Sequence, residues 1–580
     1  MTLKTSSRKI NPFWNMIGFT IRKNLGIIVV LCIASLLYYP GTFIVNYDDI
    51  ITTALNHRNN YLLENFGNAV TVLAAIIAVL FNMLNFDFLY KKSSSDVFHA
   101  FPLTRSELLM SRLLSGIAST LIPVLLCYSS FGILMAFNSW MGSFLSLLYY
   151  LLHTVIIMLV CSSFSMIFVI SAGSAFDLAL SLVGANLALI ATGWIFESIL
   201  SETLVGFYGY YVSDIIYNLS PPYFCGVGLG LANDIMKNGI NAQSIEFFVR
   251  SVIYIIGFTA ASLLLYNRRK AEKGGTAYAY KFMYLGCSLL AGICGGFLLG
   301  MMFIGDVTNL SFWFFAVIGC LLTAVIYGTI TNRGFKGVVR SVVMGALSAV
   351  VLIAVAVSGI TGGFGYTNRI PNPDKIITAS VGAFDEQIPF EDPQLILDLH
   401  KAILDTNATD CEYDYSKPYG GVENVSFHYE LKNGKTMSRS FTIDRSKVSD
   451  ELLKIYQSNE RLDMIYEHID LTNAEEFNIY FYDNNAYHDV NLSKAEADEF
   501  VKLYWQDVMQ VDESIFESKS RASEYIELSG YKKIDNNRDE YFYFRFEYNE
   551  HFENTARFIN ENNLVERSKL QNDTAQTVKY

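Results

Sequence analysis

Charged side chains are scarce in this 580-residue chain. Only 17% of its residues are Asp, Glu, Lys or Arg, whereas 52% are hydrophobic. An average soluble domain carries about 25% charged residues, so the composition argues against an ordinary soluble protein. The scarcity is also uneven. Residues 1–361 hold 20 Lys and Arg against 14 Asp and Glu, a net charge of +6, whereas residues 362–580 hold 23 against 41, a net charge of −18. The chain therefore has two unlike parts.

The sequence also lacks the motifs of several catalytic classes. It contains no P-loop pattern G-x-x-x-x-G-K-[ST], no C-x-x-C, no H-E-x-x-H and no G-x-S-x-G. The histidines of the C-terminal part show no metal-ligand spacing, and we expect them at the surface or in strands: His400, His428, His468, His488 and His551. We expect a chain that is not an enzyme and holds no cofactor or metal, so that any ATP binds to a separate subunit. The acidic C-terminal part argues against nucleic-acid binding.

The cysteines do not form a disulfide framework. Six of the eight lie within apolar runs, where a free cysteine packs as a small hydrophobic side chain. Cys225 and Cys411 lie outside these runs, and two cysteines are a weak basis for a disulfide. We expect two unpaired thiols, and pairing would require that both face an oxidising compartment.

Long apolar runs dominate residues 25–360. About 20 apolar residues are needed to cross a ~30 Å hydrocarbon core. Nine runs qualify: Leu25–Val45, Phe66–Phe86, Leu113–Phe137, Phe144–Ile170, Phe176–Ile195, Phe248–Leu265, Phe282–Phe303, Phe312–Ile330 and Val342–Ile360. The fifth run is diluted by glycine and asparagine, and the fourth and fifth together are also compatible with one broken element. The first run is too long for a signal peptide, so we expect it to remain as an anchor. We predict an α-helical polytopic membrane protein with about nine spans, followed by a C-terminal α+β soluble domain.

The distribution of Lys and Arg predicts the orientation of these spans. Basic residues collect before the first span and after the second, sixth and eighth spans, whereas the intervening segments carry mainly Asp and Glu. Since cytoplasmic loops are enriched in Lys and Arg, the N-terminus is predicted to be cytoplasmic. An odd number of spans then places residues 362–580 on the opposite, extracytoplasmic side.

Two further segments have a distinct character. In Asn11–Asn24, apolar residues recur at helical spacing before Arg22 and Lys23, which predicts a cytoplasmic interfacial helix within residues 1–24. The alternative is a plain extension of the first span. The segment Glu197–Glu246 is rich in Tyr, Gly and Leu, so we favour short re-entrant helices over a solvated loop.

The loop between the second and third spans has the most informative local pattern. It reads DFLYKKSSSDVFHAFPLTRSELLMSRLLSG, residues 87–116. Ser95 or Asp96 can cap a short helix, which Pro102 then ends. Thr104 and Glu107 match a capping box that begins the next helix. The pattern therefore predicts a short helix joined through a proline corner to the third span.

This predicted element suits a docking role at the cytoplasmic mouth of the helices. It carries Val97, Phe98 and Phe101, and a protein that docks on it from the cytosol would push on the third span through the corner. The plainer alternative is a basic, proline-broken loop that only sets the topology. In that case Arg105 is an anchor at the membrane surface and Thr104 is only a helix cap.

The same stretch resembles the permease subunits of export-type ATP-binding-cassette transporters. Their loop reads roughly H-x-L-P-(L/V)-(T/S)-R-x-x-L-L-x-x-(R/K)-L-L-S-G. The matching residues are His99, Pro102, Leu103, Thr104, Arg105, Leu108, Leu109, Arg112, Leu113, Leu114, Ser115 and Gly116, with Phe101 in place of the commoner Leu. The resemblance implies a coupling helix that docks on a cytosolic ATPase through Asp96, Phe98, His99, Phe101, Pro102, Thr104 and Arg105.

The resemblance extends beyond the loop and implies a domain plan. The interfacial helix and the first six spans, residues 25–266, are similar to the permease core. Three additional spans, residues 267–361, and an acidic extracytoplasmic domain, residues 362–580, look like Ytr-type permeases of Gram-positive bacteria, with the domain match resting on Asn424–Ile443. It implies a bacterial plasma membrane location, a cytosolic ATPase subunit and a second permease chain in a homo- or heterodimer. Besides the lipid bilayer, no further partner is implied.

Function is left with two alternatives. The cores of the predicted spans contain no Lys or Arg, which argues against a proton- or ion-driven transporter. An ATP-driven permease that exports a substrate or acts on the cell envelope is the main hypothesis. A membrane-bound envelope sensor, whose external domain binds a ligand without transport, is the alternative.

The C-terminal part predicts an α+β domain. A helix begins at Asp392-Pro393, and Asn433-Gly434 is typical of a hairpin turn. A second hairpin pairs Phe477–Tyr482 with Tyr487–Leu492, a helix capped by Ser493 and Glu496 follows, and Tyr541–Tyr548 is a further strand. The repeated pairing of helix and hairpin suggests a duplication, with coincidence as an equal alternative.

Overall fold

The computed structural model describes most of the chain. It covers residues 11–41, 61–137, 144–209, 242–270, 272, 274–276, 278–335, 337–384, 386–409, 421–469, 474–483, 486–513, 524–535, 538–548 and 552–568, and single residues between 220 and 228. The chain divides into two compact units, one formed by residues 1–202 and 209–357 and the other by residues 203–208 and 358–580. The predicted boundary, between Thr361 and Gly362, lies close to the second division.

The first unit is helical. Eight of its described helices are long and apolar enough to cross a membrane: α5 (Tyr61–Asn85), α7 (Arg105–Phe137), α8 (Phe144–Ser171), α9 (Ala175–Thr203), α12 (Ala242–Arg268), α13 (Lys281–Phe303), α14 (Leu310–Thr331) and α15 (Val338–Ile360). They coincide with the second to ninth predicted spans. The alternative that the fourth and fifth runs form one broken element is wrong, because α8 and α9 are separate helices of 28 and 29 residues.

The first predicted span forms part of a bent pair of helices. Helix α1 (Pro12–Lys23) begins with Pro12 after the Asn11 cap, whose side-chain oxygen accepts the Phe13 N–H at 3.1 Å. Helix α2 (Leu25–Leu36) follows at an angle of 60° and leads into a π-turn, Leu37–Gly41. Taken as one span, this pair raises the candidate spans among the described residues to nine. The bend separates the predicted interfacial helix from the apolar run.

Several predictions lie outside the described residues. These are the end of the first run, both Cys225 and Cys411, and most of the segment predicted to be re-entrant. The first residues of that segment, Glu197 to Thr203, belong to helix α9.

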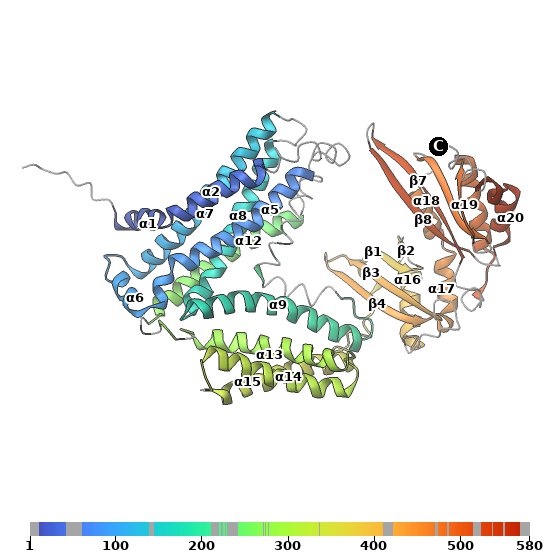
Figure 1. The fold of residues 1–580 in the computed structure, drawn as a ribbon. Helices are drawn as coiled ribbons and strands as arrows, with labels where there is room; N and C mark the ends of the chain where they lie inside the picture. The colour runs from blue at the N-terminus through green and yellow to red at the C-terminus, as the bar shows by residue number, and fades with distance from the viewer. Residues whose placement is uncertain are drawn as a thin grey trace, which may run out of the picture. The chain divides into compact units, whose positions relative to one another are not determined.

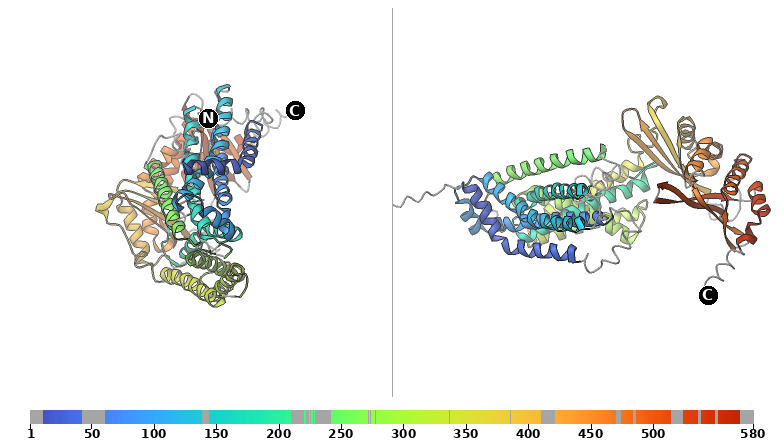
Figure 2. Two further views of the ribbon diagram at one scale, coloured as in Figure 1. Left: turned by 90° about the vertical axis from the view of Figure 1, so that its left-hand side faces the viewer. Right: turned by 90° about the horizontal axis from the view of Figure 1, so that it is seen from above.

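The spanning helices pack closely through small residues. Helices α5, α7, α8 and α12 lie side by side, as do α13 and α14 (Figures 1 and 2). A Cβ atom added to Gly319 of α14 would lie 2.6 Å from the Gly295 carbonyl oxygen and 2.9 Å from the Gly296 Cα. Small residues thus let these backbones approach, as is typical of helix pairs in membranes.

The second unit contains two four-stranded antiparallel sheets. The first is formed by β1 (Ile376–Ala383), β2 (Glu386–Phe390), β3 (Val422–Leu431) and β4 (Thr436–Asp444), in the order β2-β1-β3-β4. The second is formed by β5 (Ala474–Asp483), β6 (Ala486–Leu492), β7 (Glu524–Asp535) and β8 (Arg538–Tyr548), in the order β6-β5-β7-β8. The predicted hairpin at Asn433-Gly434 and the second predicted hairpin are both confirmed.

The two sheets are repeats of one unit. In each, a hairpin is followed by a helix, α16 (Gln394–Asp405) or α19 (Lys494–Val508), and then by a second hairpin. The registers correspond as well: Val381 pairs with Phe427 as Ile479 pairs with Leu528, and each repeat has an irregularity at the start of its first strand. Strand irregularities such as β-bulges are usually retained among related domains, so finding one at the same register position in both sheets favours a common origin. We therefore interpret the unit as an internal duplication.

Three further helices complete this unit: α17 (Ser449–Tyr456), α18 (Asn459–Ile469) and α20 (Glu553–Glu561). The buried apolar side chains of both repeats form one continuous core. The expectation that the histidines lie at the surface or in strands is wrong for His400, which is fully buried in α16, stacks on Phe427 and bonds the Tyr429 hydroxyl at 3.0 Å.

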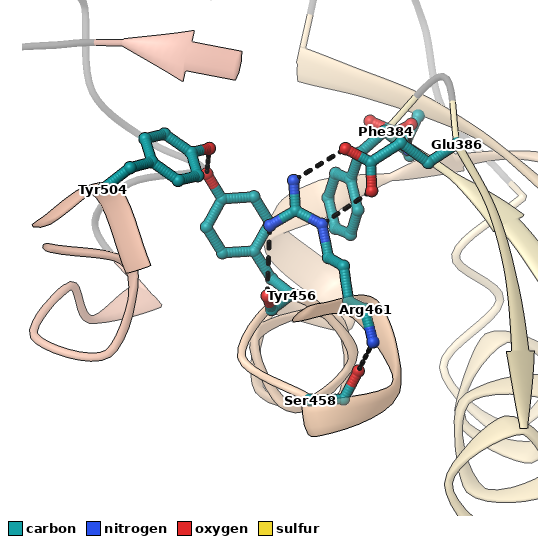
Figure 3. A network of polar contacts seen from close by, with 7 residues as sticks. Phe384, Glu386, Tyr456, Ser458, Arg461 and Tyr504 are labelled. Atoms are coloured by element: carbon teal, nitrogen blue, oxygen red, sulfur yellow. Dashed lines mark hydrogen bonds and ion pairs between the residues drawn. The ribbon is translucent and has the colours of Figure 1, made fainter. Parts of the chain in front are cut away.

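A buried ion pair joins the repeats (Figure 3). Arg461 of α18 donates from Nε and Nη2 to the two carboxylate oxygens of Glu386 in β2, at 2.7 and 2.9 Å, and from Nη1 to the Tyr456 carbonyl at 3.2 Å. The Tyr456 hydroxyl lies 3.3 Å from that of Tyr504 in α19. Burial lowers the pKa of Arg461, but the Glu386 carboxylate, together with Tyr504 and Tyr456, raises it well above its ordinary value, so the guanidinium stays charged.

Candidate functional site

The short helix α6 (Lys92–His99) lies between α5 and α7, where the sequence predicts it. It follows a 3₁₀ turn, Asp87–Tyr90. Its cap is Lys91, whose carbonyl accepts the Ser95 N–H at 3.0 Å. The prediction that Ser95 or Asp96 caps this helix is therefore wrong, because both lie within it. Aromatic packing of Phe88 on Phe98, with ring centroids 4.6 Å apart, fixes the preceding turn and lets the helix begin earlier.

The proline corner and the capping box are confirmed. Helix α6 ends at His99, and Pro102 lies between it and α7. The Thr104 N–H donates to a Glu107 carboxylate oxygen at 2.8 Å, and the Glu107 N–H donates to the Thr104 hydroxyl at 3.2 Å. This reciprocal pair satisfies two of the free N–H groups at the start of α7. The corner is therefore held by hydrogen bonds as well as by proline.

The predicted docking residues divide into two groups. Asp96, Phe101, Pro102 and Thr104 are exposed, as is the neighbouring Val97. Phe98 and His99 are half-buried and turn toward the helices. The His99 ring contacts the Ser95 carbonyl at 2.7 Å through Nδ1 and the Tyr266 hydroxyl at 3.3 Å through Nε2. The exposed group offers a surface, and the inward group attaches that surface to the helical unit.

Arg105 is exposed, but its guanidinium contacts the helical unit. Its Nη1 donates to the carbonyl oxygens of Asn267 at 3.0 Å and Arg269 at 2.8 Å. These carbonyls lie at the C-terminal end of α12, where backbone acceptors have no partner within the helix. The role of Arg105 in the structure is thus to join the start of α7 to the end of α12.

Arg112 is a fully buried residue that the sequence reading placed in a loop. It lies two turns into α7, and its Nη1 donates to the Asn85 carbonyl at the end of α5, at 3.1 Å. Its guanidinium carbon lies 4.4 Å from the Phe98 ring centroid and 5.3 Å from that of Phe88. Its spacing from Leu108 and Leu109, three and four residues earlier, is the signal that could have placed it on the buried face.

Arg269 is the third arginine of this group. Its Nη1 donates to the carbonyls of Ile170 and Ala172 at the end of α8, the second at 2.9 Å, and its Nη2 donates to the Leu89 carbonyl at 2.9 Å. Burial lowers the pKa of the Arg269 guanidinium and raises the pKa of the nearby Tyr90 hydroxyl. Both groups are therefore largely buried on the inner side of the site.

Together these arginines bind the C-terminal ends of three helices, α12, α5 and α8. Helix C-termini carry partial negative charge and unpaired carbonyls, so a guanidinium is favoured there on both counts. We name Arg105, Arg112 and Arg269 the arginine clamp. These contacts link the ends of three helices next to α6, so a displacement of α6 would disturb the hydrogen bonds at those helix ends.

Comparisons with known proteins give little further information. Residues 429–551 match a family described as a domain of unknown function (DUF6449). The match begins within β3 and ends just after β8, so it covers the end of the first repeat and the strands of the second. No curated protein and no solved structure matches the chain.

Proposed function

We propose that this chain is the membrane subunit of an ATP-binding-cassette transporter, moved by a separate ATPase that docks on α6. The observation that carries the proposal is the α6–Pro102–α7 element. It presents Asp96, Val97 and Phe101 outward, while its inner side is attached to three helix ends through the arginine clamp.

A force applied to α6 has two routes into the helices. One is the backbone, through the hydrogen-bonded corner into α7, a continuous helix of 33 residues. The other is the half-buried side chains, through Phe98 to Arg112 and α5, and through His99 to Tyr266 and α12. Rigid elements with discrete contacts are suited to passing such movements on.

The contacts of the helix ends agree with the predicted alternation of spans. The end of α8 and the start of α13 meet in a β-bridge between Ala172 and Tyr278. The Tyr278 hydroxyl lies 2.7 Å from that of Tyr327, near the end of α14. With the arginine clamp, these contacts link the basic loops that the charge distribution assigns to the cytoplasmic side. That assignment places α6 where a cytosolic ATPase can reach it.

A pull-down of the full-length chain from its own membranes tests the proposal. P-loop ATPases that co-purify are identified by mass spectrometry, and ATP turnover of the eluate is measured. Phe101→Asp adds a charge to the exposed face of α6, where Phe101 is 43% exposed, and is expected to release the ATPase. The matched control is Phe335→Asp, since Phe335 is 84% exposed between α14 and α15.

Arg105→Glu is a poor test, because its contacts with Asn267 and Arg269 make it part of the fold. If Phe101→Asp inserts normally and retains both the ATPase and its turnover, docking on α6 is rejected. Release by Phe335→Asp as well would indicate that the assay reports nonspecific damage.

A further inference from the structure

The geometry around Arg112 is not that of an ordinary membrane anchor. An arginine near a helix end normally extends its guanidinium to water. Here the whole side chain is buried, and its Nε and Nη2 have no hydrogen-bond partner among the described residues. Its guanidinium donates to the Asn85 carbonyl, lies over the faces of two aromatic rings and interacts electrostatically with Asp87 and Tyr266.

The rings belong to the docking element. Phe98 is on α6, and its centroid is the closer of the two, at 4.4 Å from the guanidinium carbon. A cation held over an aromatic face is attracted by the ring quadrupole, and the attraction grows when both groups are shielded from water. Phe98 therefore supplies part of the compensation for a buried charge, and it does so only while α6 is in place.

The other side of Arg112 is fixed to the helices. The Asn85 side chain donates to the Arg112 carbonyl at 3.2 Å, and Asn24, at the bend between α1 and α2, donates to the Asn85 side chain at 2.7 Å. All three residues are buried. The guanidinium is thus held by the Asn85 carbonyl of α5, and the Arg112 backbone is held through the Asn85 side chain to the α1–α2 bend, whereas the Phe98 ring belongs to α6.

We propose that Arg112 is the positioning residue that holds α6 in register, through a cation–π contact with Phe98. Its Nε and Nη2 atoms, which carry three N–H groups, have no hydrogen-bond partner among the described residues, and a shift of α6 that admits water would satisfy them. The proposal deepens the proposed function, because it names the contact through which docking on α6 reaches α5 and α7. The positioning itself does not depend on an ATPase.

Hydrogen exchange of the full-length protein tests the positioning directly. Phe98→Leu keeps an apolar side chain but removes the ring face, and Arg112→Met removes the charge. Each is expected to speed exchange of the α6 amides at least tenfold, with no change in α14. Phe98→Tyr keeps the ring face and is expected to keep the protection of the native protein.

The double variant gives the decisive comparison. If Arg112 and Phe98 act through one contact, Arg112→Met with Phe98→Leu exchanges no more than about twofold faster than the faster single variant. Unchanged α6 exchange in Phe98→Leu, or multiplicative effects in the double variant, would overturn the proposal. Phe98→Leu also covers the case in which Arg112→Met fails to fold.

A second measurement separates this proposal from the proposed function. In the pull-down, Phe98→Leu is expected to retain the ATPase, because the exposed face of α6 is intact, but to alter its turnover. If α6 exchanges faster in Phe98→Leu but no ATPase co-purifies with the native protein, the positioning role is supported and the transporter proposal is rejected. If an ATPase co-purifies but α6 exchange in Phe98→Leu is unchanged, the transporter proposal is supported and the positioning role is rejected.

Discussion

The Glu386–Arg461 pair provides a quantitative test of how the two repeats are held together. Arg461 is 1% exposed and Glu386 9% exposed at the side chain, so neither charge is solvated. Removing one partner of a buried ion pair leaves the other uncompensated and typically costs about 3–5 kcal/mol. Arg461→Met also removes the bond to the Tyr456 carbonyl and the stacking at 4.2 Å on the Tyr456 ring. We therefore expect the C-terminal unit to lose about 3–5 kcal/mol of its free energy of unfolding.

Hydrogen exchange measures this loss without isolating the unit. Since about 1.4 kcal/mol corresponds to a tenfold change in an equilibrium constant, protected amides in β2 and α18 should exchange roughly 10²–10⁴ times faster. For a unit of this size the thermal midpoint should fall by about 6–20 °C. The matched control is Arg545→Met, which breaks the exposed pair with Glu527 at 3.1 Å and should cost less than about 1 kcal/mol.

The double variant separates pairing from packing. With Glu386→Leu added to Arg461→Met, no unpaired charge remains, and stability should recover to within about 1–2 kcal/mol of the native protein. The reasoning is refuted if Arg461→Met costs no more than the Arg545→Met control. It is also refuted if the double variant is less stable than Arg461→Met alone, since unpaired charge would then not be the cause.

Three further outcomes are expected. Burial, and secondarily Arg439, lowers the pKa of His400 to about 4. The unfolded chain, in which a histidine has a pKa of about 6.5, therefore binds the proton more readily than the folded chain. The free energy of unfolding of the C-terminal unit should keep its full value above about pH 6.5 and fall by about 3 kcal/mol as the pH drops to about 4. His400→Gln should flatten this dependence in denaturant titrations, and His468→Gln, at an exposed position, should not. Asp507 accepts the Thr555 N–H and hydroxyl, both at 2.7 Å, so Asp507→Ala should lower the free energy of unfolding by about 2–4 kcal/mol. Unchanged stability in denaturant titrations would contradict the role of these bonds in joining α19 and α20. A Cβ atom at position 345 would lie 2.8 Å from backbone atoms of α14, so Gly345→Leu should abolish the monodisperse peak in size-exclusion chromatography. The control is Gly286→Leu, because the space around Gly286 is open.

The helical unit was largely predictable because its signals are local. Apolar length determines a span, and proline with a capping box determines the corner before α7, so neither depends on distant contacts. The start of α6 was mispredicted because Ser95 and Asp96 are good caps in isolation, whereas the contact of Phe98 with Phe88 extends the helix to Lys92. Tertiary packing overrode the local preference.

The inner side of the site was missed for a related reason. Lys and Arg in loops were read as topological charges, which gives the side of the membrane but not the partner of each side chain. Arg112 and Arg269 are buried, and their acceptors belong to helices 27 to 180 residues away in sequence. Helix α7 begins eight residues before the predicted third span, so Arg112 lies within the helix but outside the predicted span core, which contains no Lys or Arg. In the C-terminal unit, α17 and α18 were missed because they are only 8 and 11 residues long.

The duplication allows the two sheets to be compared position by position, and they differ on the face opposite α16 and α19. In the first repeat this face carries small or polar residues such as Ser380, Ser426 and His428, and residues 203–208 of the same unit pack on it. The Gly206 carbonyl accepts the Ser440 N–H at 3.4 Å on the edge strand β4, and the Tyr208 ring lies 4.8 Å from that of His428.

The equivalent face of the second repeat carries larger rings. Tyr531 and Tyr541 are direct cross-strand partners with centroids 5.3 Å apart, and Tyr543 lies next along β8. All three are about half exposed. Small side chains in the first repeat leave room for residues 203–208 of the same unit. In the shared register, Ser426 and His428 correspond to Glu527 and Ser529, whereas Tyr531, Tyr541 and Tyr543 correspond to Glu430, Thr436 and Ser438. The two copies therefore differ on this face where the second repeat carries half-exposed tyrosines in place of Glu430, Thr436 and Ser438.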